Sequence, residues 1–480
     1  MKQVFVVFDD RPEPPAQIRQ IIGSKSFGNV ILRRRTLRER LKVQSGEAGF
    51  ILFERDTEKV FSSLTDGAAV IHLFSSAAVA DEREYRVILQ KAAYAEETYQ
   101  LCAARSSGGS CPCGAVFRNK KEWKRALEEE PGPEGLKERF GKYPGIRSDA
   151  FFDLTDIQSF LSFLTSGFEA RFFNRLDGDE FTVTKRSENR EKIRAEYEFY
   201  RLLPDSMKPW FVMPYDYSED DKGASYTMER MHMTDLAVRF VHGAIGKDEF
   251  ERILSLLFRF ISGRSAKIST GEEAEALRKR LYIDKVKERI KVFLSIPEAK
   301  AIEAAVAAMS PYASLQAIEN EYEELYETLR AGKPEKNILV IGHGDLCFSN
   351  ILYQPDADFI RFIDPRGGLK EEDIWTDPYY DVAKLSHSAC GGYDLINSAQ
   401  YQIVVDSKLN MALKPDMDTG EYAHLFRKYA QEAGFRFELV RLFECSLFLS
   451  MLPLHIDRPQ KVLAFILNAA SILKELKENG

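Results

Sequence analysis

Two short segments in the C-terminal half of the chain carry side chains suited to phosphoryl transfer. The first is His343–Asn350, with the sequence HGDLCFSN, and the second is Phe362–Gly367, with the sequence FIDPRG. A loop carboxylate such as Asp345 can orient an attacking hydroxyl and accept its proton. Magnesium prefers hard oxygen ligands, which Asn350 and Asp364 supply. The chain between these two residues is long enough for a hairpin that brings them together.

The order H-G-D-x-x-x-x-N followed by I-D-P resembles the catalytic segment of the aminoglycoside phosphotransferase and choline kinase family. Members of that family have a protein-kinase-like fold. The resemblance implies that Asp345 is the catalytic base and that Asn350 and Asp364 bind Mg²⁺, with ATP as the phosphate donor. It also implies that His343 holds the catalytic loop through hydrogen bonds.

A kinase-like fold also requires a lysine on a strand and a glutamate on a helix. The strand-like run Thr182–Lys185 supplies the lysine, which would neutralise the α- and β-phosphates. Glu196 lies on an expected helix over 193–203 and would pair with Lys185. Glu198 is the alternative partner, but residues two apart point to different faces of a helix, so only one of them can fill the role.

The segment Tyr226–Met231 is predicted to be a strand that leads into the helical part of the fold, as a kinase hinge does. Adenine would bind to backbone groups over 228–231, a stretch that contains Met228, Glu229 and Met231. The methionine side chains would lie against its face. Only Gly178 lies between the first two expected strands, so the phosphate-binding loop is abbreviated.

Further candidates have two interpretations each. Arg366 could contact substrate or phosphate, or only form a salt bridge with Asp364. The resemblance places Asp381 at a position that supports the catalytic loop.

Tyr282, Lys285 and Arg289 follow the spacing i, i+3, i+7, which puts them on one face of a regular helix. That face could approach an anionic substrate or could be a solvated charged surface.

A wider set of segments is similar to phosphotransferases of bacterial capsule and surface-polysaccharide clusters. These segments are Phe152–Phe160, Arg171–Leu176, Tyr282–Arg289 and Asp364–Gly367. In that group a sugar-nucleotidyltransferase-like domain often precedes the kinase-like domain. The resemblance implies an acceptor hydroxyl on a sugar, alditol, amino-acid derivative or amino alcohol.

The first 105 residues contain short apolar runs separated by charged, helix-like stretches, which predicts an α/β domain with a parallel, Rossmann-like sheet. The runs are Val4–Phe8, Asn29–Leu32, Phe50–Phe53 and Ala69–Phe74, and a longer helix is expected over Glu82–Leu101. The resemblance implies that this domain is nucleotidyltransferase-like. No glycine-rich phosphate loop follows the first run, so we expect a degenerate version of such a domain.

The remaining chain is expected to contain a linker and a bilobal α+β unit. Residues 106–150 are rich in Pro and Gly and predict a linker with one short helix over Lys120–Glu129. Residues 151–232 predict a small mixed N-lobe, and 233–480 predict a helical C-lobe of a kinase-like domain.

The composition limits the class of partner. The 480 residues carry 67 Lys and Arg against 74 Asp and Glu, a net charge of −7, which argues against a chain built to bind nucleic acid. The apolar stretches over 68–80 and 445–456 fall short of the ~20 residues that span a bilayer. Six cysteines in 480 residues form no disulfide framework, so we expect a reduced, cytoplasmic protein. The family resemblance implies that its partner is a small molecule.

The hypothesis that accounts for most residues is an ATP- and Mg²⁺-dependent kinase acting on an alcohol group of a metabolite, plausibly in surface-polysaccharide biosynthesis. One alternative is a nucleotide-binding pseudokinase that scaffolds a biosynthetic pathway. Another is a bifunctional kinase and nucleotidyltransferase. The identity of the acceptor, the choice between ATP and GTP, the activity of the N-terminal domain and the oligomeric state do not follow from the sequence.

Overall fold

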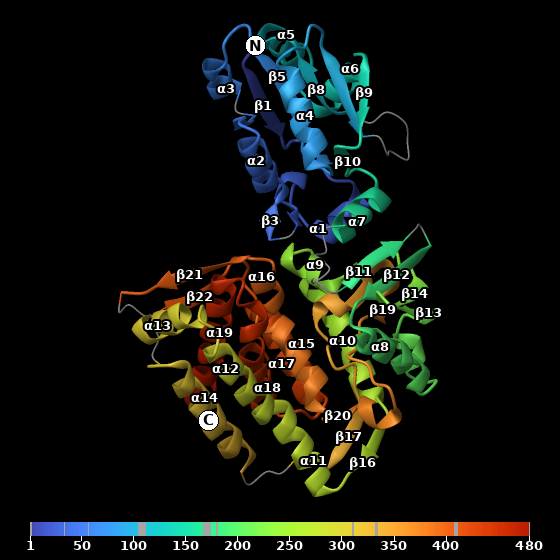
Figure 1. Cartoon of the computed structure of the whole chain (residues 1–480), viewed down its shortest axis with the longest axis vertical. Coiled ribbons are helices and arrows are strands. Elements are labelled where there is room, and N and C mark those ends of the chain that lie inside the picture. Colours follow the sequence, from blue (N-terminus) through green and yellow to red (C-terminus); the bar gives the residue numbers. More distant parts are fainter. Residues whose placement is uncertain are drawn as a thin grey trace. The chain divides into compact units, whose positions relative to one another are not determined.

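The computed structural model describes residues 2–32, 34–55, 57–103, 112–166, 174–178, 181–309, 312–331, 335–407 and 411–479. The chain divides into two compact units (Figure 1). The first contains Met1–Glu169 and His242–Ala244, and the second contains Ala170–Val241 and Ile245–Gly480. No helix in these described ranges is both long enough and apolar enough to cross a membrane.

The first unit is built on a six-stranded sheet with the order β4-β1-β5-β8-β7-β9. The strands are β1 (Val4–Asp9), β4 (Leu52–Glu54), β5 (Ala69–Phe74), β7 (Tyr99–Ala103), β8 (Pro112–Phe117) and β9 (Gly145–Ser148). Strands β4, β1 and β5 are parallel, whereas β8 runs antiparallel to both β5 and β7. The sheet is therefore mixed. Three of the strands predicted within the first 105 residues, β1, β4 and β5, are parallel as expected, and the antiparallel strand β8 lies in the stretch predicted to be a linker.

Both faces of this sheet are covered. Alternate residues of β1 belong to two separate cores, with Val4, Val6 and Phe8 in one and Phe5 and Val7 in the other. This double burial explains why β1 is a continuous apolar run. The flanking helices are α1 (Ala16–Ile22), α2 (Leu37–Glu47), α3 (Thr57–Ser63), α4 (Glu82–Ala92), α5 (Lys120–Glu129), α6 (Pro133–Phe140) and α7 (Ile157–Ser166).

Two expected segments of the first unit differ in the structure. The helix expected over Glu82–Leu101 ends at Ala92, and β7 begins at Tyr99. The expected linker contains β8, α5, α6 and β9, so residues 112–148 belong to the folded first unit. Pro and Gly mark turns inside a domain as well as linkers between domains, which is why composition alone did not separate the two.

The second unit begins with a four-stranded antiparallel sheet of order β11-β12-β14-β13. Its strands are β11 (Asn174–Gly178), β12 (Thr182–Ser187), β13 (Pro214–Asp220) and β14 (Gly223–Glu229). Helix α8 (Arg190–Leu202) is capped by Asn189 and packs Ile193 against Ala224 and Tyr226 of β14. Between α8 and β13, a 3-10 turn, η2 (Lys208–Trp210), precedes an isolated bridge at Phe211.

The rest of the second unit is mainly helical and surrounds α18 (Phe437–Ser450), whose residues are buried except Glu438. Helices α12, α15 and α19 pack against α18. The other helices of this part are α9 (Leu236–Val241), α10 (Lys247–Gly263), α11 (Gly271–Arg278), α12 (Lys285–Leu294), α13 (Ala299–Met309), α14 (Leu315–Arg330), α15 (Tyr379–Ala389), α16 (Tyr393–Asn397), α17 (Gly420–Glu432) and α19 (Pro459–Asn479).

Short strands hold the two chemistry-bearing segments in place. Strand β17 (Ile338–Ile341) pairs with β16 (Ala266–Ile268) and β20 (Trp375–Thr376), and the segment 342–350 follows it. Strands β18 (Ile351–Gln354) and β19 (Phe359–Phe362) form an antiparallel hairpin, and Asp364 lies just beyond β19. The strands therefore bring the two segments to one place, as the hairpin expectation required.

Candidate active site

Lys185 lies on β12 at the centre of a buried charge cluster. Its Nζ donates to Glu196 Oε2 at 2.7 Å and to Asp364 Oδ1 at 2.8 Å. Burial lowers the pKa of the Lys185 ammonium, but the negative charges of Asp364 and Glu196 outweigh burial and raise it above its ordinary value. Lys185 is therefore a fixed cation. The alternative partner, Glu198, instead lies 3.7 Å from Arg201.

Asp364 reaches this cluster from a strained backbone. Its φ is +57°, a left-handed conformation that costs a non-glycine residue of order 1 kcal/mol or more. The segment that follows packs closely against α8, the helix that carries Glu196. Gly368 N–H donates to the Ala195 carbonyl at 3.1 Å, and a Cβ on Gly367 would lie 2.5 Å from Ala195 backbone atoms. This packing fixes the backbone that follows Asp364 against α8, and the Asp364 side chain reaches Lys185 from there.

Asp345 lies on the loop after β17 with its carboxylate half-exposed. Lys384 Nζ lies 2.9 Å from Asp345 Oδ1. Asn350 Nδ2 donates to the Asp345 backbone carbonyl at 2.8 Å and lies 3.3 Å from Oδ2. Lys384 was not among the predicted residues, although its position three residues after Asp381 on one helix was a usable signal.

Asp381, on α15, anchors the start of the loop that carries Asp345. Its carboxylate accepts the backbone N–H groups of His343 and Gly344, each at 2.9 Å. Arg264 Nη1 donates to the same carboxylate at 3.1 Å, and both side chains are buried. Arg264 carried no signal in the sequence, because its partner lies far along the chain.

His343 links the two chemistry-bearing segments. Its Nε2 lies 2.9 Å from the Ile363 carbonyl, and its Nδ1 accepts the Asp345 N–H at 3.2 Å. Burial lowers the pKa of the imidazole, so His343 is neutral with the proton on Nε2. The ring therefore fixes the position of Asp345 relative to the residue before Asp364.

Asn350 and Asp364 offer a donor set suited to Mg²⁺. Ile363 N–H donates to the Asn350 carbonyl at 3.1 Å, which places the two segments side by side. The Asn350 amide nitrogen is occupied by Asp345, so its Oδ1 is the atom left to bind a cation. The described residues contain no cluster of three His, Cys, Asp or Glu side chains able to hold a metal. Magnesium commonly takes only one or two protein oxygens, with phosphate and water supplying the rest.

The expected adenine contacts lie at the end of β14. Met228 is half-buried against Ile193 and Tyr226, and it lines a small cleft together with Asp364. Glu229 is exposed and pairs with Thr182 in the strand ladder.

The Met231 carbonyl accepts the Met233 N–H at 2.8 Å. The stretch predicted to be the hinge is joined to β12, the strand of Lys185, by the pairing of Glu229 with Thr182.

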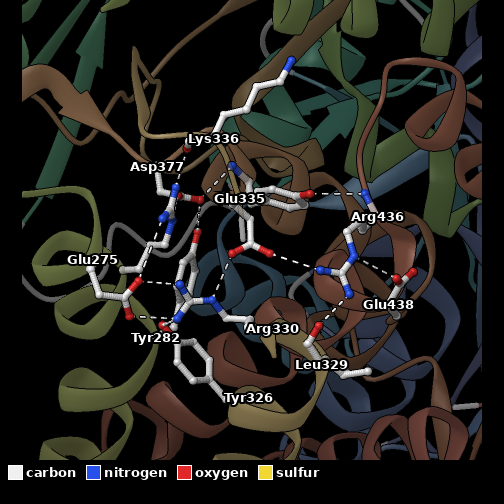
Figure 2. Close-up of polar contacts among 12 residues, drawn as sticks. Glu275, Tyr282, Tyr326, Leu329, Arg330, Glu335, Lys336, Asp377, Arg436 and Glu438 are labelled. Atoms are coloured by element: carbon white, nitrogen blue, oxygen red, sulfur yellow. Dashed lines mark hydrogen bonds and ion pairs between the residues drawn. The ribbon is translucent and has the colours of Figure 1, made fainter. Parts of the chain in front are cut away.

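The regular-helix spacing predicted that Tyr282, Lys285 and Arg289 share one face, but in the structure they do not. A π-helical segment, η3 (Lys279–Asp284), precedes α12 and shifts the register. Tyr282 points into the core, where its hydroxyl donates to Asp377 at 3.0 Å (Figure 2). Lys285 and Arg289 instead line a pocket beside the catalytic loop.

Arg366 does not pair with Asp364 in the described part of the chain. Its backbone N–H donates to the His343 carbonyl at 2.9 Å, and its exposed side chain lines the same pocket as Lys285. The salt-bridge interpretation therefore does not hold in this structure.

The sequence matches no protein-family model and no curated protein. Solved structures of aminoglycoside phosphotransferases resemble this chain at low identity. A thermostable mutant of APH(4)-Ia, in complex with ADP and hygromycin B, is 12% identical, with a TM-score of 0.40 over 65% of this chain and 97% of that chain. The GDP complex of aminoglycoside 2'-phosphotransferase-IIIa is 14% identical, with a TM-score of 0.35 over 68% and 99%. APH(3'')-Id from Streptomyces rimosus is 16% identical, with a TM-score of 0.31 over 62% and 98%.

Proposed function

We propose that the second unit is a kinase-like phosphotransferase that moves the γ-phosphoryl group of ATP to a hydroxyl of a small metabolite. The carrying observation is that Lys185 bridges Glu196 and Asp364, while His343 ties the loop of Asp345 to the segment of Asp364. Residues far apart in the chain thus meet in the arrangement that phosphoryl transfer needs. The division into an N-lobe to residue 232 and a helical C-lobe from 233 is part of the same proposal.

The donor nucleotide would be held by the charge cluster. Lys185 would bind the α- and β-phosphates, and Glu196 would keep its ammonium in place. Asp364 and Asn350 would hold Mg²⁺, which supplies charge neutralisation of the phosphates when bound. The backbone near Met228, Glu229 and Met231 would take the adenine ring.

Asp345 would act as the general base. As the acceptor oxygen forms its bond to the γ-phosphorus, the bond from that phosphorus to the β,γ-bridging oxygen breaks and ADP leaves with the electron pair. The hydroxyl proton passes to the Asp345 carboxylate. Lys384, 2.9 Å from that carboxylate, would hold it in place and add positive charge where negative charge collects.

The finer identity of the reaction follows from the sequence resemblance. We propose that the acceptor is a hydroxyl-bearing precursor of capsule or another surface polysaccharide, phosphorylated in the cytoplasm. The aminoglycoside 2'-phosphotransferase-IIIa structure contains GDP, so GTP is tested beside ATP.

The test is ADP or GDP release over a panel of sugars, alditols and amino alcohols, with the wild type compared with Asp345→Asn. We expect the substitution to lower turnover by about 10³-fold or more while nucleotide affinity stays within about twofold. Unchanged turnover in Asp345→Asn would refute the assignment of the base. Nucleotide binding without turnover on any acceptor would favour the pseudokinase alternative instead.

A further inference from the structure

A pocket of about 790 Å³ lies beside the candidate active site in the second unit. Its walls are the start of the catalytic loop at Gly342–Gly344, the stretch that begins at Arg366, and one side of the α11–α12 region. The volume is in the range that holds a small-molecule ligand. Because the loop wall ends one residue before Asp345, a molecule in this pocket is next to the proposed base.

Four cations line this pocket, and none forms an ion pair within the described ranges. They are Arg280, Lys285, Arg289 and Arg366. Other cations of this region have carboxylate partners. Lys287, on the same helix α12, lies 2.8 Å from Glu323 of α14. Five acidic residues also line the pocket, all at exposed positions, namely Glu191, Asp284, Glu288, Glu372 and Asp373. Arg280 and Arg366 are exposed too, so the half-buried charges of the pocket wall are the two cations Lys285 and Arg289.

The buried end of the pocket is positive. Tyr380 lines it while being only 3% exposed, and Lys285 Nζ donates to its hydroxyl at 3.2 Å. Burial raises the pKa of a phenol, yet the charges of Lys285, Lys384 and Arg366 outweigh burial and lower the pKa of Tyr380 below its ordinary value. Lys384 also pairs with Asp345, so the positive region extends to the proposed base.

We propose that this pocket binds an acceptor that carries an acidic group, a carboxylate or a phosphate, in addition to the hydroxyl that is phosphorylated. Lys285, Arg289 and Arg366 would hold the anion by charge-assisted hydrogen bonds. A cationic acceptor would meet charges of the wrong sign there. The inference rests on the proposed function in taking Asp345 as the base.

Binding to the full-length protein tests the pocket independently of turnover. Four probes share one sugar ring, namely glucose, glucosamine, glucuronate and glucose 6-phosphate, and calorimetry measures the affinity of each. We expect one or both anionic probes to bind, and to bind more tightly than glucose and glucosamine, with an affinity that falls as salt is raised. The comparison of glucuronate with glucose 6-phosphate distinguishes a carboxylate site from a phosphate site.

Two charge-removing variants on α12 form a matched pair. Arg289→Ala removes a pocket cation, and Lys291→Ala removes an exposed cation of the same helix that does not line the pocket. Loss of one charged contact should weaken binding of the anionic probe by about 10-fold or more in Arg289→Ala and leave it unchanged in Lys291→Ala. Equal effects of the two variants, tighter binding of glucosamine than of both anions, or no binding of either anion at millimolar concentration would each overturn the inference.

The pocket and the proposed function can fail separately. Anion binding that is sensitive to Arg289, without phosphate transfer in any assay, would retain the pocket and reject the kinase. Phosphate transfer that depends on Asp345 but occurs only with neutral or cationic acceptors would retain the kinase and reject the pocket.

Discussion

Lys185 has two carboxylate partners, and they differ in what surrounds them. Glu196 is only 3% exposed and also accepts the Tyr226 hydroxyl at 3.0 Å, so it has a single position. Asp364 is partly exposed and could move toward a bound cation. This asymmetry suggests that Glu196 positions the lysine and that Asp364 is the partner that exchanges lysine for metal and phosphate contacts.

Removal of the Glu196 charge should therefore impair phosphotransfer. In Glu196→Gln the buried lysine keeps only Asp364 as an anionic partner, and we expect kcat/KM for the nucleotide to fall by about 10- to 100-fold. Steady-state kinetics with ATP measures this. Glu198→Gln is the matched control, two residues along the same helix and 3.7 Å from Arg201. A similar loss in both variants would mean that the helix, and not the Glu196 charge, matters.

Two buried aspartates should make stability depend on pH. Burial raises the pKa of Asp235 to about 7, and burial likewise raises the pKa of Asp394 to about 7, from an ordinary value of 3.8. A carboxyl whose folded-state pKa is raised favours the folded state most fully below its unfolded value. That contribution is lost as the pH rises through about 7.

The melting temperature should accordingly fall between pH 6 and pH 8 in the wild type, and fall less in Asp394→Asn, which cannot ionise. Asp394 Oδ2 has no hydrogen-bond partner among the described residues, so a neutral amide is tolerated there better than a charge. Thermal unfolding at the two pH values measures the difference. If the melting temperature of Asp394→Asn fell with pH as steeply as that of the wild type, ionisation of Asp394 would not be a cause of the pH dependence.

At the scale of elements, the π-helical segment η3 decides which side chains face the candidate site. The spacing of Tyr282, Lys285 and Arg289 assumed 3.6 residues per turn throughout, whereas a π-turn contains an extra residue. Tyr282 consequently turns into the core beneath Asp377. No local sequence feature marks a π-turn, because tertiary packing produces it, so the pocket face could not be assigned from periodicity.

The placement of Asn350 beside Asp364 could be predicted, because the order of the motifs and the pairing of the strands both bring these two residues together. The pairing of Ile351 with Phe362 places Asn350 and Asp364 together, and that hairpin was predicted from the length of chain between the two residues. Arg264 and Lys384 were not predicted, because each depends on a contact with a residue distant in sequence. Strand β8 of the first unit was not predicted either, because Pro112–Phe117 lies in the Pro- and Gly-rich stretch that was interpreted as a linker.

A polar network joins the helices that support α15. Arg330, at the end of α14, donates to Glu275 of α11 at 2.9 Å and to Glu335 at 3.1 Å, and Arg436 reaches Glu335 at 3.3 Å (Figure 2). Arg436 N–H in turn donates to the Tyr379 hydroxyl at 3.2 Å, at the start of α15. The network thereby links α11 and α14 to α15, the helix that carries Asp381 and Lys384.

Arg330→Met should destabilise the second unit by about 1–3 kcal/mol, because Glu335 is nearly buried and loses one of its two cations. Lys287→Met is the control, since its ion pair with Glu323 is largely solvated and should contribute less than about 1 kcal/mol. Urea unfolding followed by near-UV circular dichroism measures both. Equal midpoints for the two variants would show that the network adds nothing beyond a surface pair.

At the scale of the whole molecule, the chain has a net charge of −7 and yet contains a pocket whose buried end, at Tyr380, is surrounded by cations. Overall charge therefore says little about the ligand. The two units also have separate cores, with the β1 strand between two clusters in the first and α18 at the centre of the second. A protein of this kind need not unfold in one step.

We expect two calorimetric transitions, one for each unit. Mg²⁺ and ATP should raise the midpoint temperature of the second unit's transition and leave that of the first unit unchanged. Trp123→Phe should lower the midpoint temperature of the first unit's transition. In the first unit Trp123 is fully buried and its Nε1 donates to His72 Nδ1 at 3.1 Å, while His72 Nε2 lies 3.1 Å from Asp9 Oδ2. The variant leaves a buried imidazole nitrogen without its donor and opens a cavity, which together cost about 2–4 kcal/mol. A decrease in the nucleotide-sensitive transition, or a single transition for the whole chain, would show that the units unfold together.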